Sequence, residues 1–414
     1  MPRYSFRALV AHALRRHRRW PRAIRAAELQ SGYDAVVVGG GGHGLATAYF
    51  LAKDHGMRRI AVLEKAAIGH GNSGRNTQVT RSDYFHLPSS RFFERSLQLY
   101  EGLSRELNYN IMLSQRGKVT LAHSPHELEF LRRSVNAIRM NGVDSELLLP
   151  ADLKRIEPAL NFASRYPVEG GAVQWRGGIS RHDAVVWAFA RAASALGVDI
   201  VQGCEVTGFR IDGGRVRAVE TTRGPVTAAK VCLAVAGHSS VLAQKAGLRL
   251  PIHSTGLQAM VTEPVKPLID TVLVSAAIHM YVSQTGRGEV VIGGGAEVFG
   301  SYAQRGGLPV LEANAQAAVE LFPCLGRLRV MRQWAGTADI TPDTSPIMGL
   351  TSVAGLYISG GWGTGGYKAI PAGGETMAWT IANERPHELI ASFGLGRFAS
   401  GALIDEGAAS GVAH

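Results

Sequence analysis

The order of hydrophobic and polar positions is most regular near the start of the chain. Apolar residues run without interruption from Ala35 to Val38, and a glycine-rich stretch follows. Apolar residues then recur at helical spacing until a second apolar run ends at Glu64. A short uninterrupted apolar run is typical of a buried strand. Residues 33–64 therefore predict a strand, a glycine turn, a helix and a second strand.

The rest of the chain mixes helical and strand patterns in the same way. An apolar stripe at helical spacing, from Phe92 to Leu103, predicts a helix over about 88–108. Between 203 and 240, three or four β runs are separated by Asp-Gly-Gly and Arg-Gly-Pro turns. Further helices are expected within 177–200 and at 125–140, 150–158 and 311–322, and a β-rich region at 251–335. Residues 355–382 mirror the opening, with a strand, a glycine turn and a helix.

Composition describes a globular protein with a large core. The 414 residues are 46% hydrophobic and 19% charged, and no run of 18 apolar residues is present, so no membrane span is expected. The three cysteines, Cys204, Cys232 and Cys324, lie far apart, and no Cys/His cluster suggests a metal. Free thiols in a reducing compartment are the simplest interpretation, which favours the cytoplasm.

The net charge of +11 is concentrated in an N-terminal arm. Eight arginines precede the first acid, Glu28. They are Arg3, Arg7, Arg15, Arg16, Arg18, Arg19, Arg22 and Arg25. The arm has no apolar stretch or cleavage site of a secretory signal, and no nucleic-acid-binding module accompanies it. We expect a basic arm that docks on a partner subunit, or a solvated terminus.

The glycine turn at residues 39–44 has the spacing of a dinucleotide site. Gly39, Gly41 and Gly44 fit G-x-G-x-x-G. In this motif the first glycine allows a tight turn, the second lets the backbone approach a pyrophosphate, and the third lets helix and strand pack closely. The helix N-terminus attracts the phosphates, and Glu64 falls where a carboxylate accepts the ribose hydroxyls. A dinucleotide cofactor is therefore expected.

Later features favour a flavin over a nicotinamide. A β run containing Val206 precedes residues 234–240, which we expect to be a strand ending at Ala236-Gly237 close to a flat ring. The second strand–glycine–helix unit, at 360–368, would aim N–H groups at the negative edge of a reduced flavin. Lys368 follows these glycines, in position to meet a bound anion. Together with the opening motif, these features predict FAD.

The predicted fold class is α/β, with a Rossmann-like FAD-binding domain built from discontinuous segments and a β-rich substrate domain. We assign 31–112, 170–250 and 334–395 to the FAD-binding domain. The substrate domain would comprise 113–169 and 251–333. Residues 1–30 form the basic arm, and 396–414 a C-terminal tail.

Several motifs together resemble a known family over nearly the whole chain. They include VVVGGGGHGLATAYFLA, GNSGRNT, TRSDY, SQRG, GISRHDAVVWAFARAA, AGHSSVLA, GGWGTGGYK and the tail GALIDEGAASGVAH. The combination resembles the β subunit of heterotetrameric sarcosine oxidase, which belongs to the amine-oxidising flavoproteins of the D-amino-acid oxidase type. The resemblance implies non-covalent FAD at the site of sarcosine oxidation, and FMN attached to a histidine at the contact with the α subunit.

The resemblance also implies roles for individual residues. Arg81 in TRSDY and Lys368 in GGYK would hold the substrate carboxylate while hydride leaves the N-methyl carbon. His182 in SRHDAVVW would carry covalent FMN, and Arg181 would assist its phosphate; Ala184 stands where some members have a second histidine. Residues expected around the FAD are Gly39, Gly41, His43, Gly44, Glu64, Lys65, Arg75, Asn76, Thr77, Val206, Gly237, Gly363, Gly365, Gly366 and Lys368.

Several alternatives and partners complete the set of expectations. Monomeric relatives tether FAD through a cysteine, and the matching position here is Gly336, so we expect non-covalent FAD. His43 and His70 are interpreted as backbone-capping or pocket-lining, and Trp362 as a packing residue. Alpha, gamma and delta subunits are expected partners, with NAD and tetrahydrofolate bound on a partner subunit. The alternatives are a proline- or opine-type dehydrogenase subunit and a non-catalytic flavin-binding subunit.

Overall fold

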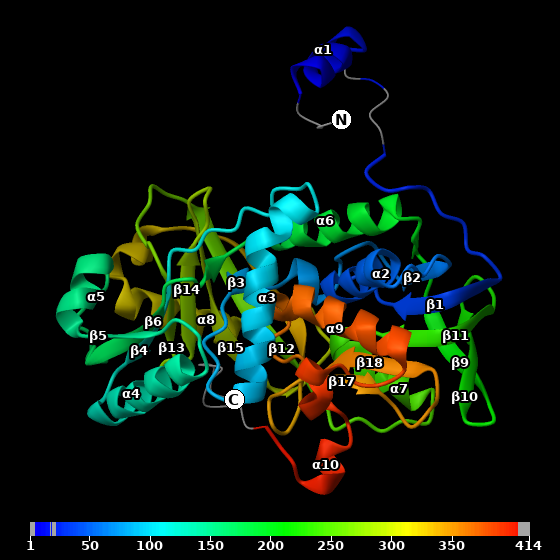
Figure 1. The fold of residues 1–414 in the computed structure, drawn as a ribbon. Helices are drawn as coiled ribbons and strands as arrows, with labels where there is room; N and C mark the ends of the chain where they lie inside the picture. Colours follow the sequence, from blue (N-terminus) through cyan, green and yellow to red (C-terminus); the bar gives the residue numbers. More distant parts are fainter. Residues whose placement is uncertain (1–4, 17, 19–21, 405–414) are drawn as a thin grey trace.

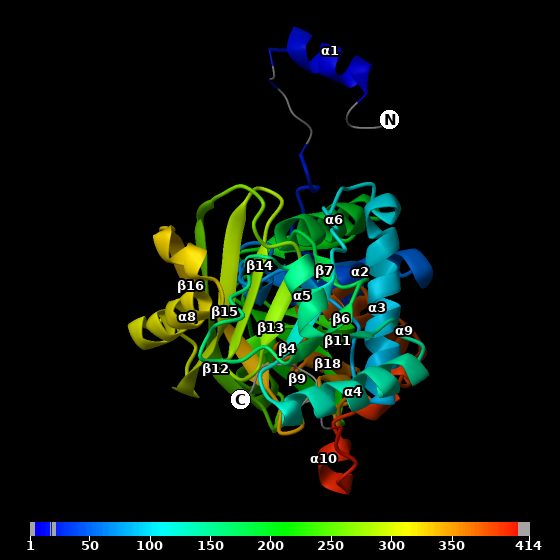
Figure 2. The same ribbon diagram turned by 90° about the vertical axis from the view of Figure 1, so that its left-hand side faces the viewer.

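The computed structural model describes residues 5–16, 18 and 22–404. Arg3 and Arg19 of the arm and residues 405–414 of the tail lie outside the described residues. In the described part, two eight-stranded sheets lie side by side with helices packed around them (Figures 1 and 2). No helix among the described residues is long and apolar enough to cross a bilayer.

The first sheet has a parallel centre and begins with the predicted βαβ unit. β1 (Gly32–Val38) pairs in parallel with β2 (Ile60–Glu64) and with β11 (Val226–Leu233). Its order is β17-β18-β11-β1-β2-β8, with a β9–β10 hairpin joined to β11. The remaining strands are β8 (Asp199–Gln202), β9 (Val206–Asp212), β10 (Arg215–Thr221), β17 (Ile347–Leu350) and β18 (Leu356–Gly360).

Helices cover the first sheet because their small residues allow close packing. α2 (Gly42–Asp54) and α9 (Ile370–Asn383) lie against each other, and a Cβ added to Gly374 would lie 2.4 Å from Ala46 Cβ. One core therefore joins β1 and β2 to α2, α9, α3 (Leu87–Glu106) and α6 (His182–Ala195). The predicted helix at 88–108 corresponds to α3.

The second sheet is mostly antiparallel and has its own core. Its order is β16-β12-β15-β14-β13-β4-β6-β5. The strands are β4 (Lys118–Ala122), β5 (Glu146–Leu148), β6 (Gly170–Gln174), β12 (His253–Pro264), β13 (Val272–Ser275), β14 (Met280–Gln284), β15 (Glu289–Gly300) and β16 (Val330–Ile340). The sequence assigns β6 and part of β16 to the FAD-binding domain, whereas in the structure both strands belong to this second sheet. The domain division itself stays a prediction.

Shorter elements complete the chain. The predicted helices at 125–140 and near 311–322 correspond to α4 (Pro125–Met140) and α8 (Leu308–Leu321). α5 (Pro150–Ile156), α7 (Ser239–Gln244) and α10 (Arg397–Ser400) are short, and β3 (Val79–Thr80) pairs with β7 (Gly178–Ile179). The 3-10 helices are η1 (Asn72–Gly74), η2 (Ala236–His238), η3 (Pro323–Arg327), η4 (Tyr367–Ala369) and η5 (Glu388–Phe393). α1 (Phe6–Leu14) stands apart from the body in both views (Figures 1 and 2).

Candidate active site

A cavity of about 830 Å³ lies where the two sheets meet. This volume is in the upper part of the roughly 300–1,000 Å³ range of ligand pockets. The first sheet contributes Val38, Leu63 and Val206 to its wall, and the second contributes Leu257 and Tyr281. The glycine turn after β1, the loop around η1 and the glycine loop after β18 close the remaining sides. The residues that line the cavity come from every segment on which the FAD prediction is based.

The turn between β1 and α2 has the geometry that its glycines predict. Gly39 has φ +112°, which favours glycine, and its N–H donates to Leu63 O at 2.8 Å. A Cβ added to Gly44 would lie only 2.0 Å from Gly39 O, so α2 starts directly against the turn. Gly41 lies on the cavity wall, at the N-cap of α2. The backbone can therefore approach a bound phosphate here.

Glu64 ends β2 at the cavity wall and already binds the backbone. Its two carboxylate oxygens accept from Gly40 N and Ala66 N, each at 2.8 Å. An ionised carboxylate has about four acceptor positions, so two bonds leave capacity for further donors. Glu64 thus fixes the glycine turn and remains able to accept ribose hydroxyls.

The polar loop at 70–78 forms the cavity wall facing the second sheet. Asn72 Nδ2 donates to Thr337 O at 2.6 Å, and Asn72 Oδ1 accepts from Thr337 N at 3.0 Å. Ser73 Oγ accepts from Gly42 N at 2.9 Å. The loop is therefore fastened both to β16 and to the start of α2. Its predicted members Arg75, Asn76 and Thr77 all lie on the cavity wall.

The glycine loop after β18 is organised by a buried carboxylate. Asp339 is 1% exposed, and its Oδ2 accepts from Gly361 N at 2.6 Å. Burial raises the pKa of Asp339 to about 6, against the effect of the backbone N–H groups around it. The loop carries Trp362, whose ring stacks on His43 at 4.1 Å. Burial also lowers the pKa of His43 to about 4, so its imidazole is neutral.

Several polar atoms in the cavity wall lack a partner among the described residues. They are His43 Nδ1, Thr337 Oγ1, Ser359 Oγ and Trp362 Nε1, all of them buried. Buried polar groups are normally hydrogen-bonded, so such a group in a cavity wall indicates a polar ligand or ordered water. Together with the open glycine turn, these atoms fit a dinucleotide such as FAD.

A cluster of buried charges lies beside the cavity and contains more cations than carboxylates. We call Arg81, Asp83, Lys118 and Lys368 the cation cluster; all but Asp83 are basic. Arg81 Nη1 contacts Asp83 Oδ1 at 2.6 Å, and Lys118 Nζ contacts Asp83 Oδ2 at 2.9 Å. Burial alone would raise the pKa of Asp83, but these two cations lower it to about 2. The cluster therefore carries an ionised Asp83 and a surplus of positive charge.

Tyr84 joins the two cations that the sequence singled out. Arg81 Cζ lies 4.5 Å from the Tyr84 ring centroid, and Lys368 Nζ lies 5.9 Å from it. Phe93 stacks on the same ring, with 3.8 Å between the ring centroids. Lys368 lies on the cavity wall, and burial followed by the charge of Arg81 holds its pKa well below the usual value. Arg81 is 4% exposed and is not part of the wall.

His182 and Arg181 lie apart from this cavity wall. His182 is the first residue of α6, and its Nδ1 is buried without a partner among the described residues. Burial lowers the pKa of His182, so its imidazole is neutral and a free nitrogen lone pair is present. Arg181 pairs with Asp183 through two contacts, of 2.9 and 2.6 Å. An orphaned buried nitrogen at a helix start fits attachment of a phosphate-bearing flavin.

Most of the predicted FAD residues line this one cavity. Those on it are Gly39, Gly41, His43, Glu64, Lys65, Arg75, Asn76, Thr77, Val206, Gly237, Gly363, Gly366 and Lys368. Gly44 and Gly365 lie behind the wall, the latter against Phe93 and Tyr84. Gly336, His70 and Trp362 also line it. The binding roles themselves stay predictions.

The prediction of a strand ending at Ala236-Gly237 is wrong. β11 ends at Leu233, and residues 236–238 form the 3-10 helix η2. Ala236 adopts φ +49°, and a Cβ added to Gly237 would lie 2.4 Å from Thr337 Cγ2. The chain thus leaves the sheet after Leu233 and turns toward β16.

Four residues of the site were missed from the sequence. Asn72, Tyr281 and Asp339 line the cavity, and Lys118 completes the cation cluster. Asn72 lies in the motif GNSGRNT, three residues before the expected FAD residue Arg75, so its polar character was a usable signal. Lys118, Tyr281 and Asp339 stand in strand patterns where nothing local distinguishes them.

Comparison with known proteins agrees with this geometry. Residues 34–379 match the family model described as FAD dependent oxidoreductase. A sarcosine oxidase subunit beta from Rhodobacter capsulatus is 49% identical over 415 residues, which is 100% of each chain. One from Arthrobacter is 51% identical over 389 residues, covering 94% of this chain and 96% of that relative.

Solved structures give the same fold. The L-proline dehydrogenase of P. horikoshii superposes with a TM-score of 0.85 at 27% identity, over 91% of this chain and 100% of that one. The glycine oxidase of Geobacillus kaustophilus has a TM-score of 0.81 at 23% identity, over 89% and 99% of the two chains. Fold, cavity and relatives lead to one conclusion. The chain is an oxidoreductase of the FAD-dependent family and belongs, within that family, to the sarcosine oxidase β subunits.

Proposed function

We propose that the chain oxidatively demethylates sarcosine (N-methylglycine) as the β subunit of a hetero-oligomer. Sarcosine, water and oxygen would give glycine, formaldehyde and hydrogen peroxide. The observation that carries the proposal is the buried surplus of cations beside the cavity. Lys368 lies on the cavity wall beside Arg81 and Lys118, donates to Thr364 O at 3.1 Å, and forms no salt bridge with a carboxylate among the described residues. Buried charges are costly unless paired, so this cluster favours an anionic ligand such as the carboxylate of an amino acid.

The chain's own residues would bind and orient the substrate. Lys368 on the cavity wall would meet the carboxylate first, and Arg81, which lies over the same Tyr84 ring, would complete its binding. The apolar wall residues Leu257 and Ala259 would exclude water around the N-methyl group. When bound, FAD supplies an acceptor for the hydride that leaves this methyl carbon. The resulting iminium would then take up water and release formaldehyde.

A second flavin and partner subunits complete the proposal. FMN would be attached to His182, whose buried Nδ1 lacks a partner among the described residues, with Arg181 near its phosphate. The two flavins together would carry the electrons to oxygen, FAD first and FMN second. Alpha, gamma and delta subunits would complete the FMN pocket and bind NAD and tetrahydrofolate. FAD itself would be non-covalent, since Gly336 offers no attachment point.

The N-terminal arm supports a role for partner subunits. α1 exposes an apolar face, with Phe6 79%, Leu9 60% and Leu14 81% exposed. The arm precedes residue 34, where the family match begins, yet the Rhodobacter relative matches over the whole chain. The arm therefore lies outside the part of the chain that matches the family model, and the Rhodobacter relative shares it. We propose that it docks in an apolar groove of a partner subunit flanked by carboxylates. The three cysteines are free, and we place the assembly in a reducing cytoplasm.

A secondary-amino-acid dehydrogenase is the second candidate function. The L-proline dehydrogenase of P. horikoshii has a high structural similarity, and proline also combines a carboxylate with a secondary amine. The cation cluster would serve either substrate. A subunit with bound flavin but no catalysis is less well supported, because both Arg81 and Lys368 are present and buried together.

The test uses protein co-expressed with its partner subunits. Acid precipitation followed by absorbance of pellet and supernatant separates covalent from free flavin. Anaerobic sarcosine is then added to intact protein. Flavin in both fractions, with bleaching by sarcosine, is the expected result, and His182→Ala should remove flavin from the pellet alone. Bleaching by proline but not sarcosine would instead identify the dehydrogenase, and no bleaching by either would point to the non-catalytic subunit.

A further inference from the structure

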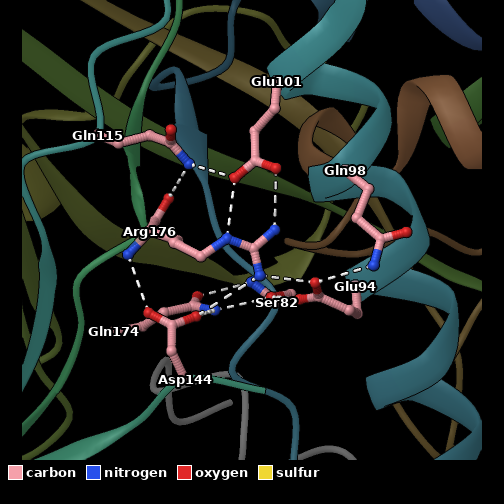
Figure 3. Close-up of polar contacts among 8 residues, drawn as sticks. All are labelled: Ser82, Glu94, Gln98, Glu101, Gln115, Asp144, Gln174 and Arg176. Atoms are coloured by element: carbon pink, nitrogen blue, oxygen red, sulfur yellow. Dashed lines mark hydrogen bonds and ion pairs between the residues drawn. The ribbon is translucent and has the colours of Figure 1, made fainter. Parts of the chain in front are cut away.

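A polar network of side chains connects Ser82, the residue after Arg81, with Gln174, Arg176 and the carboxylates around them (Figure 3). We call Ser82, Glu94, Glu101, Asp144, Gln174 and Arg176 the Arg176 network. Arg176 contacts Glu94 at 2.7 Å and Glu101 at 2.9 Å, both on α3, and Asp144 at 3.9 Å. The network therefore connects the end of β6 with α3 and with the segment between β3 and α3.

Gln174 holds Ser82 at two points. The Gln174 side chain belongs to a fully buried residue, and its Oε1 accepts from Ser82 N at 2.8 Å. Its Nε2 donates to Ser82 Oγ at 2.7 Å and to Asp144 Oδ1 at 3.0 Å. Ser82 Oγ donates in turn to Glu94 Oε2 at 2.7 Å. Both ends of the Gln174 amide are thus used, and Ser82 is fixed through its backbone and its side chain.

Ser82 stands between the two residues that form the core of the cation cluster. Arg81 and Asp83 pair with each other, whereas the Ser82 side chain between them points into the network. Fixing Ser82 therefore fixes the backbone from which the Arg81 guanidinium extends. The fastening matters because the positive charges of Lys118 and Lys368 act against that of Arg81.

Charge also favours this arrangement. The Arg176 network contains two more carboxylates than cations, and the cation cluster contains two more cations than carboxylates. Ser82 belongs to the Arg176 network, and its sequence neighbours Arg81 and Asp83 belong to the cation cluster. Adjacent groups of opposite net charge attract each other, which favours the position of the backbone at 81–83 that joins them.

We infer that Gln174 is a positioning residue, which holds Arg81 in place for the substrate carboxylate through Ser82. This inference rests on the proposed function, since it assumes a carboxylate ligand at Arg81. A flexible arginine loses rotamer freedom on binding, and a supporting shell that fixes its backbone lowers that loss. Gln174 touches neither the cavity wall nor a reacting atom, so its effect is on binding geometry alone.

The test replaces Gln174 by leucine in the FAD-loaded, co-expressed protein. Acetate serves as the probe, because it has a carboxylate but no amine, and its Kd is read from the flavin spectrum. Gln174→Leu is expected to raise the acetate Kd and the sarcosine KM by the same factor, about tenfold or more. The FAD content is expected to stay the same, and kcat to change less than KM. A general folding defect would lower FAD content and kcat as well.

The matched control is Gln115→Leu. Gln115 Nε2 donates to Glu101 Oε1 and to Arg176 O, so this variant loses two bonds of the same network without touching Ser82 or Gln174. Its acetate Kd should stay within twofold of wild type. If Gln174→Leu does not accumulate as folded protein, Ser82→Ala removes the Oγ contacts alone and should raise the acetate Kd by a smaller factor.

The outcomes separate this inference from the proposed function. Wild type that binds acetate and reacts with sarcosine, with an unchanged Kd in Gln174→Leu or Ser82→Ala, would overturn the role of Gln174. An equal rise in Gln115→Leu would overturn it too, since the effect would then belong to the whole network. Wild type that binds acetate but is not bleached by sarcosine would contradict the proposed function and leave the acetate comparison valid.

Discussion

At the scale of single residues, Lys368 is the cation whose charge depends most on what the cavity holds. Burial and Arg81 lower its pKa, so a charged Lys368 destabilises the fold until an anion binds. We expect Lys368→Met to raise the dissociation constant of sarcosine by about 10- to 100-fold, the effect of losing a charge-assisted hydrogen bond. The melting temperature should stay the same or rise. Anaerobic titration of the flavin spectrum and thermal unfolding measure both quantities.

Lys230→Met is the control for Lys368→Met. Lys230 lies on β11, outside the cavity wall, and its Nζ pairs with a Glu384 carboxylate oxygen at 3.0 Å. This variant should lower the melting temperature slightly, because it breaks a partly buried ion pair, and leave sarcosine affinity unchanged. Equal affinities for Lys368→Met and wild type would remove Lys368 from the carboxylate site.

The raised pKa of the Asp339 side chain predicts that the free energy of unfolding depends on pH. Its pKa is about 6 in the folded protein and 3.8 ordinarily, so the folded state binds more protons between these values. Its contribution to stability is therefore present below about pH 4 and is lost as pH rises through 6, by roughly 3 kcal/mol. In Asp339→Asn this part of the dependence should be missing. Urea unfolding of both proteins from pH 4 to 7 measures it; parallel curves would contradict the assignment.

At the scale of elements, the contact between the glycine turn and α2 determines whether the cofactor site forms. A Cβ at position 44 would lie 2.0 Å from Gly39 O, so Gly44→Ala must push α2 away from β1. We expect a loss of about 1–3 kcal/mol in the free energy of unfolding, together with loss of bound FAD. Denaturant unfolding and flavin absorbance after gel filtration measure the two effects.

Gly102→Ala is the matched control within another helix. Gly102 lies in α3, and an added Cβ there would meet nothing within 4 Å. The substitution should leave FAD content unchanged and stabilise the protein by about 0.5–1 kcal/mol, since alanine is the better helix former. Retention of FAD in Gly44→Ala at wild-type stability would show that the close approach is dispensable.

At the scale of the whole molecule, α1 predicts an interface rather than a contribution to the fold. Leu9→Asp with Leu14→Asp places charges on the exposed apolar face, and Ala8→Asp places one on the other side of the helix. We expect the double variant to co-purify with less partner subunit, and Ala8→Asp to assemble normally. Both should keep wild-type FAD content and melting temperature. Assembly mass by light scattering decides; normal assembly of the double variant would exclude this docking surface.

The sequence alone could determine the features that depend on near neighbours. The G-x-G-x-x-G turn, the acid at Glu64 and the helix at α3 follow from local conformation and from apolar periodicity, and the structure has all three. The strand predicted up to Gly237 failed for the complementary reason. Its early end depends on the approach of Thr337, a residue far away in the sequence.

Only the tertiary structure brings the parts of the candidate site together. Motifs could suggest Arg81 and Lys368 separately, but their shared contact with Tyr84 exists only once α3 and the β18 loop pack against each other. Lys118, Asp339 and Gln174 carry no local signal, because each occupies an ordinary position in a strand. Their importance comes from burial beside other charges or amides, and burial is a property of the folded chain.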